Sequence, residues 1–494
     1  MSQTRSSEPS HDPLKASKLF ALPEKPADLF VLLMRLGLLV CLVASVSLAL
    51  HSAFSTRTRW FSFPERLSRN VSRFTETGPT NISHILFGLA GAAHTWRERS
   101  RYSELWWEPN TTRGYVWLDE KPTGKNSLRP GISVPYRVSE DWTRFKYSSS
   151  QSAVRIARIV LESFKLGLPN VRWFVMGDDD TVYFADNVVS VLARYDHNEM
   201  YYIGGSSESV EQNVMHSYDM GFGGGGFAIS YPLAAQLVKL MDGCLDRYYR
   251  FYGSDQRVWA CVSEIGVPLT IQRGFHQFDI RGDPYGILAA HPLAPLLSLH
   301  HLDYLNPMFP NQTQIESLNS LMHAYRVDPA RILQQSFCYN YRRKWSVSIA
   351  WGYTIQLYTT LLPAKDLETP LLTFKTWRSW KDGPFTFNTR PMSSDPCGQP
   401  VTYFLDKVQK VGKCGTLTTY KRFVGKQGKS CGKAEYGRAM AVKRIIVSSM
   451  KMDPEYWKKA PRRQCCEIMD HGTKKSRIMR IRIRKCRPWE TITI

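Results

Sequence analysis

The sequence predicts an α/β fold with a mostly parallel sheet, because short apolar runs of strand length alternate with helical segments through the middle of the chain. Residues 173–176 form one such run, and the acids Asp178, Asp179 and Asp180 follow it after a single glycine. Residues 149–166 instead carry apolar side chains at helical spacing. The three acids are therefore expected at the C-terminal tip of a buried strand, where α/β sheets hold their ligands.

The expected strands and helices alternate in order along the chain. The first strand is predicted at 84–90, and a helix follows it at 92–107. Further strands are expected at 115–118, 173–176 and 201–204, and further helices at 149–166, 185–195, 233–241 and 255–265. Helical crossovers return the chain to the same end of the sheet, so this alternation favours parallel pairing. Beyond about Phe337 the pattern becomes mixed and aromatic.

Composition divides the 494 residues into six segments. They are a cytosolic tail at 1–28, a transmembrane signal anchor at 29–50, a stem at 51–79, the α/β domain at 80–335, a C-terminal extension of that domain at 336–410 and a basic, cysteine-containing tail module at 411–494. The anchor is assigned because residues 30–50 are almost wholly apolar, with Arg35 the only charge, and are long enough for a bilayer core. A cleaved signal peptide is the competing interpretation, but the polar leader is long and no clean cleavage position follows.

Sequons and cysteines indicate a lumenal location for the segments after the anchor. Four sequons follow the anchor, at Asn70, Asn81, Asn110 and Asn311. Of the ten cysteines, most lie in the last hundred residues, at spacings that do not match a zinc site, although the adjacent Cys465 and Cys466 leave that alternative open. An oxidising compartment with disulfides in the C-terminal region fits better. The nine cysteines beyond the anchor would leave one unpaired.

Most of the formal net charge of +22 lies in the C-terminal region and not in the centre of the chain. From Asp406 onward there are about two dozen Lys and Arg against about seven acids. No nucleic-acid-binding motif accompanies this charge, and the anchor and sequons argue against a nucleic-acid partner. We expect the basic tail to associate with anionic polysaccharide or acidic lumenal partners.

Three adjacent carboxylates at a strand end indicate a cation site. The charges of Asp178, Asp179 and Asp180 repel one another, so folding gains nothing from them alone. A hard divalent cation such as Mn²⁺ or Mg²⁺ removes that cost, because it prefers oxygen ligands and bridges to substrate phosphates. The alternative is a solvated acidic turn that caps the next helix.

Three further patterns are candidates for the same site. Residues 221–226 contain four consecutive glycines, including Gly224 and Gly225, and predict a loop that brings backbone close to a ligand; a plain flexible turn is the alternative. Asp255 lies at an expected helix start, as a general base or simply near the N-cap. His300 and His301 could complete a cation site, or they could be structural.

Together these motifs resemble the Fringe-related branch of glycosyltransferase family 31, and most closely its plant Fringe-like group with a domain of unknown function. The resemblance rests on residues 174–181, 221–230, 253–255 and 298–303 in this order and spacing. It covers roughly Thr80 to Asp303 and, for the plant group, continues to about Lys407. It implies a GT-A type nucleotide-sugar-binding fold in a single-pass type II Golgi membrane protein with a lumenal catalytic domain.

The resemblance also implies roles for individual residues. Asp178 would approach the ribose, and Asp179 and Asp180 would bind Mn²⁺ (or Mg²⁺) and the diphosphate, with His300 completing the metal site and His301 as the alternative. Asp255 would be the catalytic base, while the loop with Gly224 and Gly225 would line the donor and acceptor pocket. The chain departs from animal Fringe proteins at Ser254, where they carry a second acid.

The implied function is an inverting, Mn²⁺-dependent transfer of a hexose or N-acetylhexosamine from a UDP-sugar to a hydroxyl of a glycan or glycoprotein, with a β1,3 linkage. The alternative is a catalytically weak lumenal protein that binds sugar or UDP-sugar on the same fold, because fold alone does not settle activity. A stem and an anchor are also compatible with a homodimer.

Overall fold

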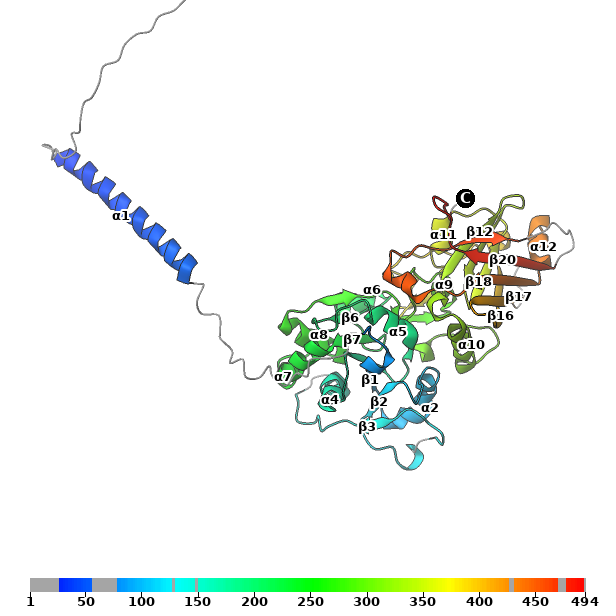
Figure 1. Cartoon of the computed structure of the whole chain (residues 1–494), viewed down its shortest axis with the longest axis horizontal. Coiled ribbons are helices and arrows are strands. Elements are labelled where there is room, and N and C mark those ends of the chain that lie inside the picture. Colours follow the sequence, from blue (N-terminus) through cyan, green and yellow to red (C-terminus); the bar gives the residue numbers. More distant parts are fainter. Residues whose placement is uncertain are drawn as a thin grey trace, which may run out of the picture. The chain divides into compact units, whose positions relative to one another are not determined.

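A computed structural model describes residues 26–55, 78–126, 129–146, 150–425, 431–469 and 477–492. The chain divides into two units, Met1–Glu76 and Thr77–Ile494, and Figure 1 shows helix α1 of the first. In the first unit, helix α1 (Pro26–Ser55) contains the stretch Leu33–Leu50, which is long and apolar enough to cross a membrane. A helix of this kind near the N-terminus is compatible with a type II anchor and with a signal sequence. The expected cytosolic tail and stem lie mostly outside the described residues.

The second unit is built on a seven-stranded sheet with the order β3-β2-β1-β4-β7-β6-β8. Its strands are β1 (Ile85–Ala90), β2 (Arg113–Leu118), β3 (Tyr136–Val138), β4 (Trp173–Asp178), β6 (Tyr202–Gly204), β7 (Phe227–Ser230) and β8 (Leu269–Ile271). Four of the ladders are parallel, and the two that involve β7 are antiparallel. The predicted mostly parallel sheet is therefore confirmed. The strand β7 was not predicted.

Helices cover both faces of this sheet. The layer formed by α3 (Gln151–Ala157), α4 (Ile159–Lys165), α7 (Tyr231–Arg247) and α8 (Ser254–Ile265) packs on Leu86 and Phe174. Figure 1 shows α4, α7 and α8 beside the sheet. The opposite face, with Phe87 and Val175, packs against α5 (Ala185–Leu192) and the core that continues into the C-terminal half. Helix α2 (Ala93–Glu104) follows β1. The single helix expected at 149–166 is wrong in one respect: it divides at Arg158, whose side chain pairs with Glu140 and Asp242.

Short strands after the main sheet bring later parts of the chain to its edge. One small sheet has the order β5-β11-β9 and joins β5 (Val182–Tyr183), β11 (Ser298–Leu299) and β9 (Phe275–His276). In another, β10 (Ile280–Gly282) pairs with β15 (Phe374–Thr376). The remaining helices in this part of the chain are α6 (Val210–Met215), α9 (Tyr285–Ala289), α10 (Gln314–Val327) and α11 (Ala364–Glu368), and the last three contact strands of the barrel described next. The first pairing brings His300 to the acids at the end of β4, and Trp377, which follows β15, stacks on the neighbouring His301.

The C-terminal half forms a closed eight-stranded barrel. Its strands are, in spatial order, β12 (Gln335–Asn340), β13 (Trp345–Ala350), β14 (Thr354–Tyr358), β16 (Val401–Val411), β17 (Gly415–Arg422), β18 (Arg444–Met450), β20 (Ile478–Arg484) and β19 (Cys465–Ile468). The expected boundary between the extension, 336–410, and the tail module, 411–494, falls within β16. Because a barrel closes only when every strand is paired, the structure does not separate these two segments. Helix α12 (Ala434–Ala441) lies between β17 and β18 in the chain.

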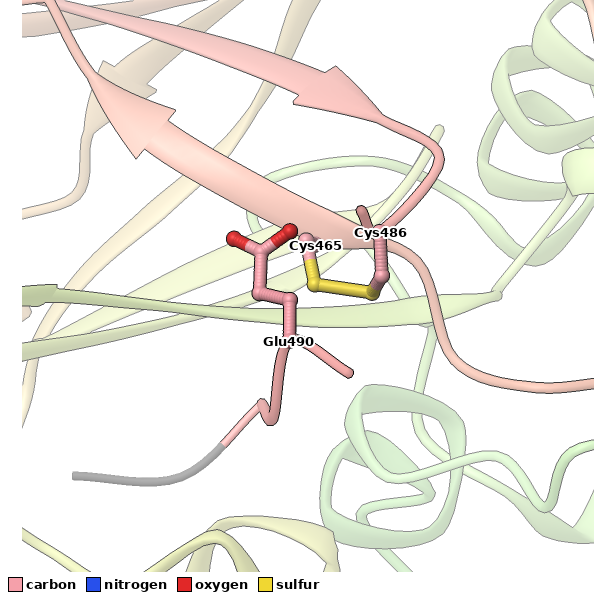
Figure 2. Close-up of side chains that lie close together, drawn as sticks. All are labelled: Cys465, Cys486 and Glu490. Carbon is pink, nitrogen blue, oxygen red and sulfur yellow. A yellow bond between two sulfur atoms is a disulfide. The ribbon is translucent and has the colours of Figure 1, made fainter. Parts of the chain in front are cut away.

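Four disulfides support the second unit. Cys244–Cys261 joins α7 to α8, Cys338–Cys466 joins β12 to β19, and Cys397–Cys431 and Cys465–Cys486 lie in the C-terminal region. Figure 2 shows the last of these beside Glu490. The predicted disulfides of the C-terminal region are confirmed, and Cys414 is the unpaired cysteine beyond the anchor.

Candidate active site

A crevice opens where the strand order of the main sheet reverses. Strands β2 and β3 lie on one side of β1 and β4 lies on the other, so the loops that follow β1 and β4 leave the sheet in different directions. The cavity at this point has a volume of about 560 Å³ and is lined by Gly91, Arg99, Trp142, Arg155 and the acids Asp178 and Asp179, among others. The sequence prediction that the acids end a buried strand at a ligand-binding edge is therefore consistent with the observed geometry.

Asp178, Asp180 and His300 form a compact group of ligand-type side chains. Their ligand atoms all lie within 4.8 Å of one another. The Nε2 atom of His300 is 3.2 Å from Asp180 Oδ1 and 3.5 Å from Asp178 Oδ2. The acids come from the end of β4 and His300 directly follows β11, which pairs with β5 just beyond the acids. The structure thus brings together residues that are about 120 positions apart in the sequence.

Asp179, the middle acid of the three, is outside this group and pairs with Arg99 of α2. The Arg99 guanidinium is 3.0 Å from Asp179, 3.4 Å from Asp180 and 3.5 Å from Asp303. Asp303 also accepts a hydrogen bond from the hydroxyl of Tyr102. The resemblance assigned Asp179 and Asp180 to the cation, whereas the geometry groups Asp178 with Asp180. The metal-binding roles of these acids stay predictions.

Burial and neighbouring charges act in opposite directions on these groups. Burial raises the pKa of Asp179, and the Asp180 carboxylate raises it further. Burial also raises the pKa of Asp180, but His300 and Arg99 outweigh that effect and hold it below its usual value. Burial lowers the pKa of His300, yet Asp180 and Asp178 together raise it to about 10. A positive charge near the carboxylates is therefore favoured at this position.

The donor set fits a divalent cation. Among the described residues, the buried atoms Asp179 Oδ2 and His300 Nδ1 have no hydrogen-bond partner, and Asp180 Oδ1 faces the His300 imidazole. Two carboxylates and an imidazole are ligands that Mn²⁺ accepts. A second group of ligand-type residues, Cys465, Cys486 and Glu490, is not a metal site, because the two sulfurs are bonded to each other (Figure 2).

The glycine loop packs directly against this group. At Gly224 a Cβ atom would lie 2.0 Å from Cε1 of His300, so only glycine fits beneath the imidazole. The amide of Gly225 donates to Gln277, at 2.6 Å from Oε1, and its carbonyl accepts from Ser298. Gly226 has a φ of +94°, which other residues rarely adopt. The loop therefore shapes the site and is not a plain flexible turn.

Asp255 lies in the first turn of α8, close to the same loop. Its Oδ2 atom accepts a hydrogen bond of 3.1 Å from the amide of Gly223. Burial and the charge of Asp178 raise its pKa, although the Gly223 hydrogen bond opposes them. A small pocket of about 20 Å³ is lined by Asp178, Gly223 and Asp255, among other residues. Asp178 thus lines both this pocket and the large crevice.

His301 points away from the acid group. It has a left-handed backbone, with φ of 53°, and its Nδ1 atom is 2.9 Å from Asp279. Its ring stacks on Trp377 at a centroid distance of 4.4 Å and an interplanar angle of 6°. The sequence left His300 and His301 as alternatives, and the structure places His300 with the acids. Arg99, Asp279 and Trp377 were not predicted as neighbours of the site, because no local pattern distinguishes them.

Residues 212–466 match the family model described as "Protein of unknown function, DUF604". The chain belongs to the DUF604 family. The resemblance to Fringe-related proteins is confirmed only at the level of this Fringe-like domain family, and the plant group stays a prediction. The part of the chain that matches DUF604 includes Asp255, His300 and most of the barrel, but it begins after the acids of β4.

No curated protein matches this DUF604 chain at the level of its sequence. Among solved structures, it is similar to a glycosyltransferase involved in the glycosylation of the major capsid of PBCV-1, with 13% identity over 47% of this chain and 98% of the other and a TM-score of 0.26. It is also similar to mouse xyloside xylosyltransferase 1 in its apo form, with 11% identity over 38% and 84% of the two chains and a TM-score of 0.23. These similarities to glycosyltransferases are weak and carry no argument about the site.

Proposed function

We propose that this DUF604 protein is an inverting, divalent-cation-dependent glycosyltransferase of the GT-A type. It would transfer a hexose or N-acetylhexosamine from a UDP-sugar to a hydroxyl of a glycan or glycoprotein, in a β1,3 linkage. The observation that supports this most is the grouping of Asp178, Asp180 and His300 at the crevice, with Asp255 across a pocket from Asp178. We further propose that α1 anchors the chain in the Golgi membrane as a single-pass type II protein.

The crevice has the features that a nucleotide diphosphate requires. Arg99 and Arg155 line it and supply positive charge, while Trp142 offers an aromatic ring for a base. Asp178, Asp180 and His300 would hold Mn²⁺ or Mg²⁺, which when bound neutralises charge on the departing diphosphate. Arg99 keeps the remaining acid, Asp179, paired and oriented.

We propose Asp255 as the general base. Its raised pKa favours uptake of a proton from an acceptor hydroxyl as that oxygen attacks the anomeric carbon. The bond from that carbon to the UDP oxygen breaks, UDP leaves, and the proton remains on Asp255. Attack opposite the leaving group inverts the anomeric configuration. The Gly223 amide holds the carboxylate in place for this step.

A second candidate function is a binding protein on the same fold. Its support is the ion pairing of Arg99 with both Asp179 and Asp180, which balances part of the acidic charge without a cation. The absence of a second acid at Ser254 is compatible with weak catalysis.

The test is binding and hydrolysis of UDP-galactose, UDP-N-acetylglucosamine and UDP-glucose by the full-length protein in detergent, with Mn²⁺ and with chelator. We expect Mn²⁺-dependent turnover of one donor that is lost in Asp180→Asn. The exposed Asp406→Asn on β16 is the matched control and should behave as wild type. Donor binding without turnover, with or without acceptors, would favour the binding protein. A folded sample that does not bind UDP would contradict both.

A further inference from the structure

A cluster of aromatic side chains lies beside the acid group and is not used by the proposed reaction. Trp377 stacks on His301, and the His301 ring is 3.9 Å from that of His300. Tyr304 meets the edge of Trp377 at a centroid distance of 5.0 Å. The cluster is therefore separated from the candidate cation ligands by a single imidazole ring.

One arginine lies among these rings. The Arg281 guanidinium carbon is 3.9 Å from the ring centroid of Trp377, 4.7 Å from that of Tyr304 and 5.4 Å from that of Trp380. Its Nε atom donates to the carbonyl of Trp377 at 3.2 Å. Within the described ranges no carboxylate lies within 4 Å of this guanidinium, so its terminal nitrogens can donate to a ligand.

Two of the three rings in this cluster are exposed, and Trp377 between them is half-buried. Trp380 is 61% exposed and Tyr304 is 46% exposed. Helix α6, which contacts the loop carrying Trp380, also exposes Val214 and Met215. Exposed aromatic rings that gather around one side chain, as Tyr304 and Trp380 do around Arg281, mark a binding face more often than a solvated one.

The loop that carries the tryptophans is fixed in place. The Arg378 amide donates to Glu211 at 3.1 Å and its Nε atom donates to Gln212 at 2.9 Å, both on α6. Within the loop, the amide of Lys381 donates to the hydroxyl of Thr376 at 3.0 Å. Strand β15 before the loop pairs with β10, which carries Arg281. The rings are therefore preorganised, which lowers the entropic cost of binding.

We propose that Tyr304, Trp377 and Trp380, together with Arg281, form the subsite for a pyranoside of the acceptor glycan, an inference that rests on the function proposed above. The apolar face of a pyranose ring packs on an exposed aromatic ring, and the guanidinium donates to its hydroxyl or carboxylate oxygens. The ring contacts through His301 to His300 put this subsite one imidazole away from the candidate cation ligands. Neutral sugars and uronic acids share this chemistry.

The test measures sugar binding without turnover. Full-length protein in detergent is titrated with methyl β-galactoside, methyl β-N-acetylglucosaminide and methyl β-glucuronide, and binding is followed by saturation-transfer NMR. Trp380→Ala should weaken binding of the preferred sugar about tenfold, whereas Trp380→Phe should retain most of it. Trp489→Ala removes a tryptophan that is 98% exposed in the C-terminal region and should bind as wild type. If the uronic acid is the preferred ligand, Arg281→Gln should weaken binding of the glucuronide more than binding of the neutral sugars. If it is not, the substitution should weaken binding of all three sugars about equally.

Two outcomes would overturn the subsite. One is equal binding by Trp380→Ala and Trp489→Ala, and the other is no binding of any of the three sugars by the wild type. A change of oligomeric state in Trp380→Ala with unchanged sugar binding would assign the face to self-association instead. Mn²⁺-dependent UDP binding is measured on the same samples: its loss with sugar binding intact would contradict the proposed transferase and not this subsite.

Discussion

The imidazole of His300 lies directly on the backbone of Gly224, and a Cβ atom at position 224 would be 2.0 Å from its Cε1 atom. His300 is also the residue that connects the acids of β4 to the aromatic cluster beyond His301. The position of the His300 imidazole therefore depends on residue 224 having no side chain, and a substitution of Gly224 tests this dependence.

Gly224→Ala should displace His300 and weaken cation binding by at least about tenfold, because one of three ligands moves. Isothermal titration with Mn²⁺ measures this directly. Gly437→Ala, in α12, is the matched control, since a Cβ there meets open space and an alanine in a helix is expected to stabilise by about 0.5–1 kcal/mol. Unchanged Mn²⁺ affinity in Gly224→Ala would show that His300 is not a ligand.

Arg99→Met should lower the melting temperature in the absence of a cation. The substitution leaves the buried carboxylates of Asp179 and Asp180 without their guanidinium partner, and loss of one partner of a buried pair costs about 3–5 kcal/mol. Because Mn²⁺ supplies the missing positive charge, we expect a larger Mn²⁺-induced rise in melting temperature than in the wild type.

Thermal unfolding with Mn²⁺ and with chelator tests this expectation. The control is Arg101→Met, which removes the more exposed arginine of the same helix. An equal Mn²⁺ response in Arg99→Met and the wild type would contradict a cation site at these acids.

Asp255→Asn should reduce transfer by about 10²–10⁴-fold and leave UDP binding unchanged, since the carboxylate is needed only to take a proton. The raised pKa of Asp255 has a defined consequence for the wild type. As the pH falls, kcat/KM should decline at a pH above the ordinary range for an aspartate, because the base becomes protonated earlier. A pH profile of transfer checks this, with Asp246→Asn on α7 as an exposed control. A profile flat down to pH 4 would exclude Asp255 as the base.

The raised pKa of Glu162 predicts how the free energy of unfolding depends on pH. This buried glutamate on α4 has a pKa raised to about 7, chiefly by burial. Between its unfolded value of 4.5 and about 7 the folded state holds a proton that the unfolded state has lost, so the free energy of unfolding falls as the pH rises through this window. Glu162→Gln should therefore stabilise the protein at pH 8 by about 1 kcal/mol and have little effect at pH 4.

Denaturant unfolding of both proteins at the two pH values is the measurement. Glu199→Gln, at an exposed position, should change stability at neither pH. Destabilisation by Glu162→Gln at pH 8 would mean that the carboxylate is ionised and paired in the folded protein.

Local patterns in the sequence were enough to predict part of the site. Residues 173–176 predicted a strand because four consecutive apolar residues followed by a glycine are typical of a short buried strand. The acids that follow in the sequence therefore had to lie at the end of this strand. The helix start at Ser254 and Asp255 was readable for the same reason. The pairing of His300 with Asp178 and Asp180 was not derivable from the residues, because it depends on β11 pairing with β5 across more than a hundred residues.

The C-terminal barrel was not predicted, and its strands were divided between two expected segments. Strand β20 alternates outward arginines with buried residues such as Ile481, but the parallel pairing of β20 with β18 is a long-range contact that no local pattern records. The pairing of the cysteines could not be predicted for the same reason, because each disulfide joins residues that are distant in the sequence.

The sequence by itself determined the alternation of strands and helices that favours a parallel sheet, the apolar N-terminal helix and the acids at the end of β4, because each depends on residues that are close together in the chain. Only the tertiary structure decided that His300 and not His301 faces those acids, that Arg99 pairs with Asp179, and that Trp377 stacks on His301. Side-chain direction at a site depends on backbone angles and on packing between distant segments. The positive φ of His301, which turns its ring from the acids toward Trp377, is such a feature.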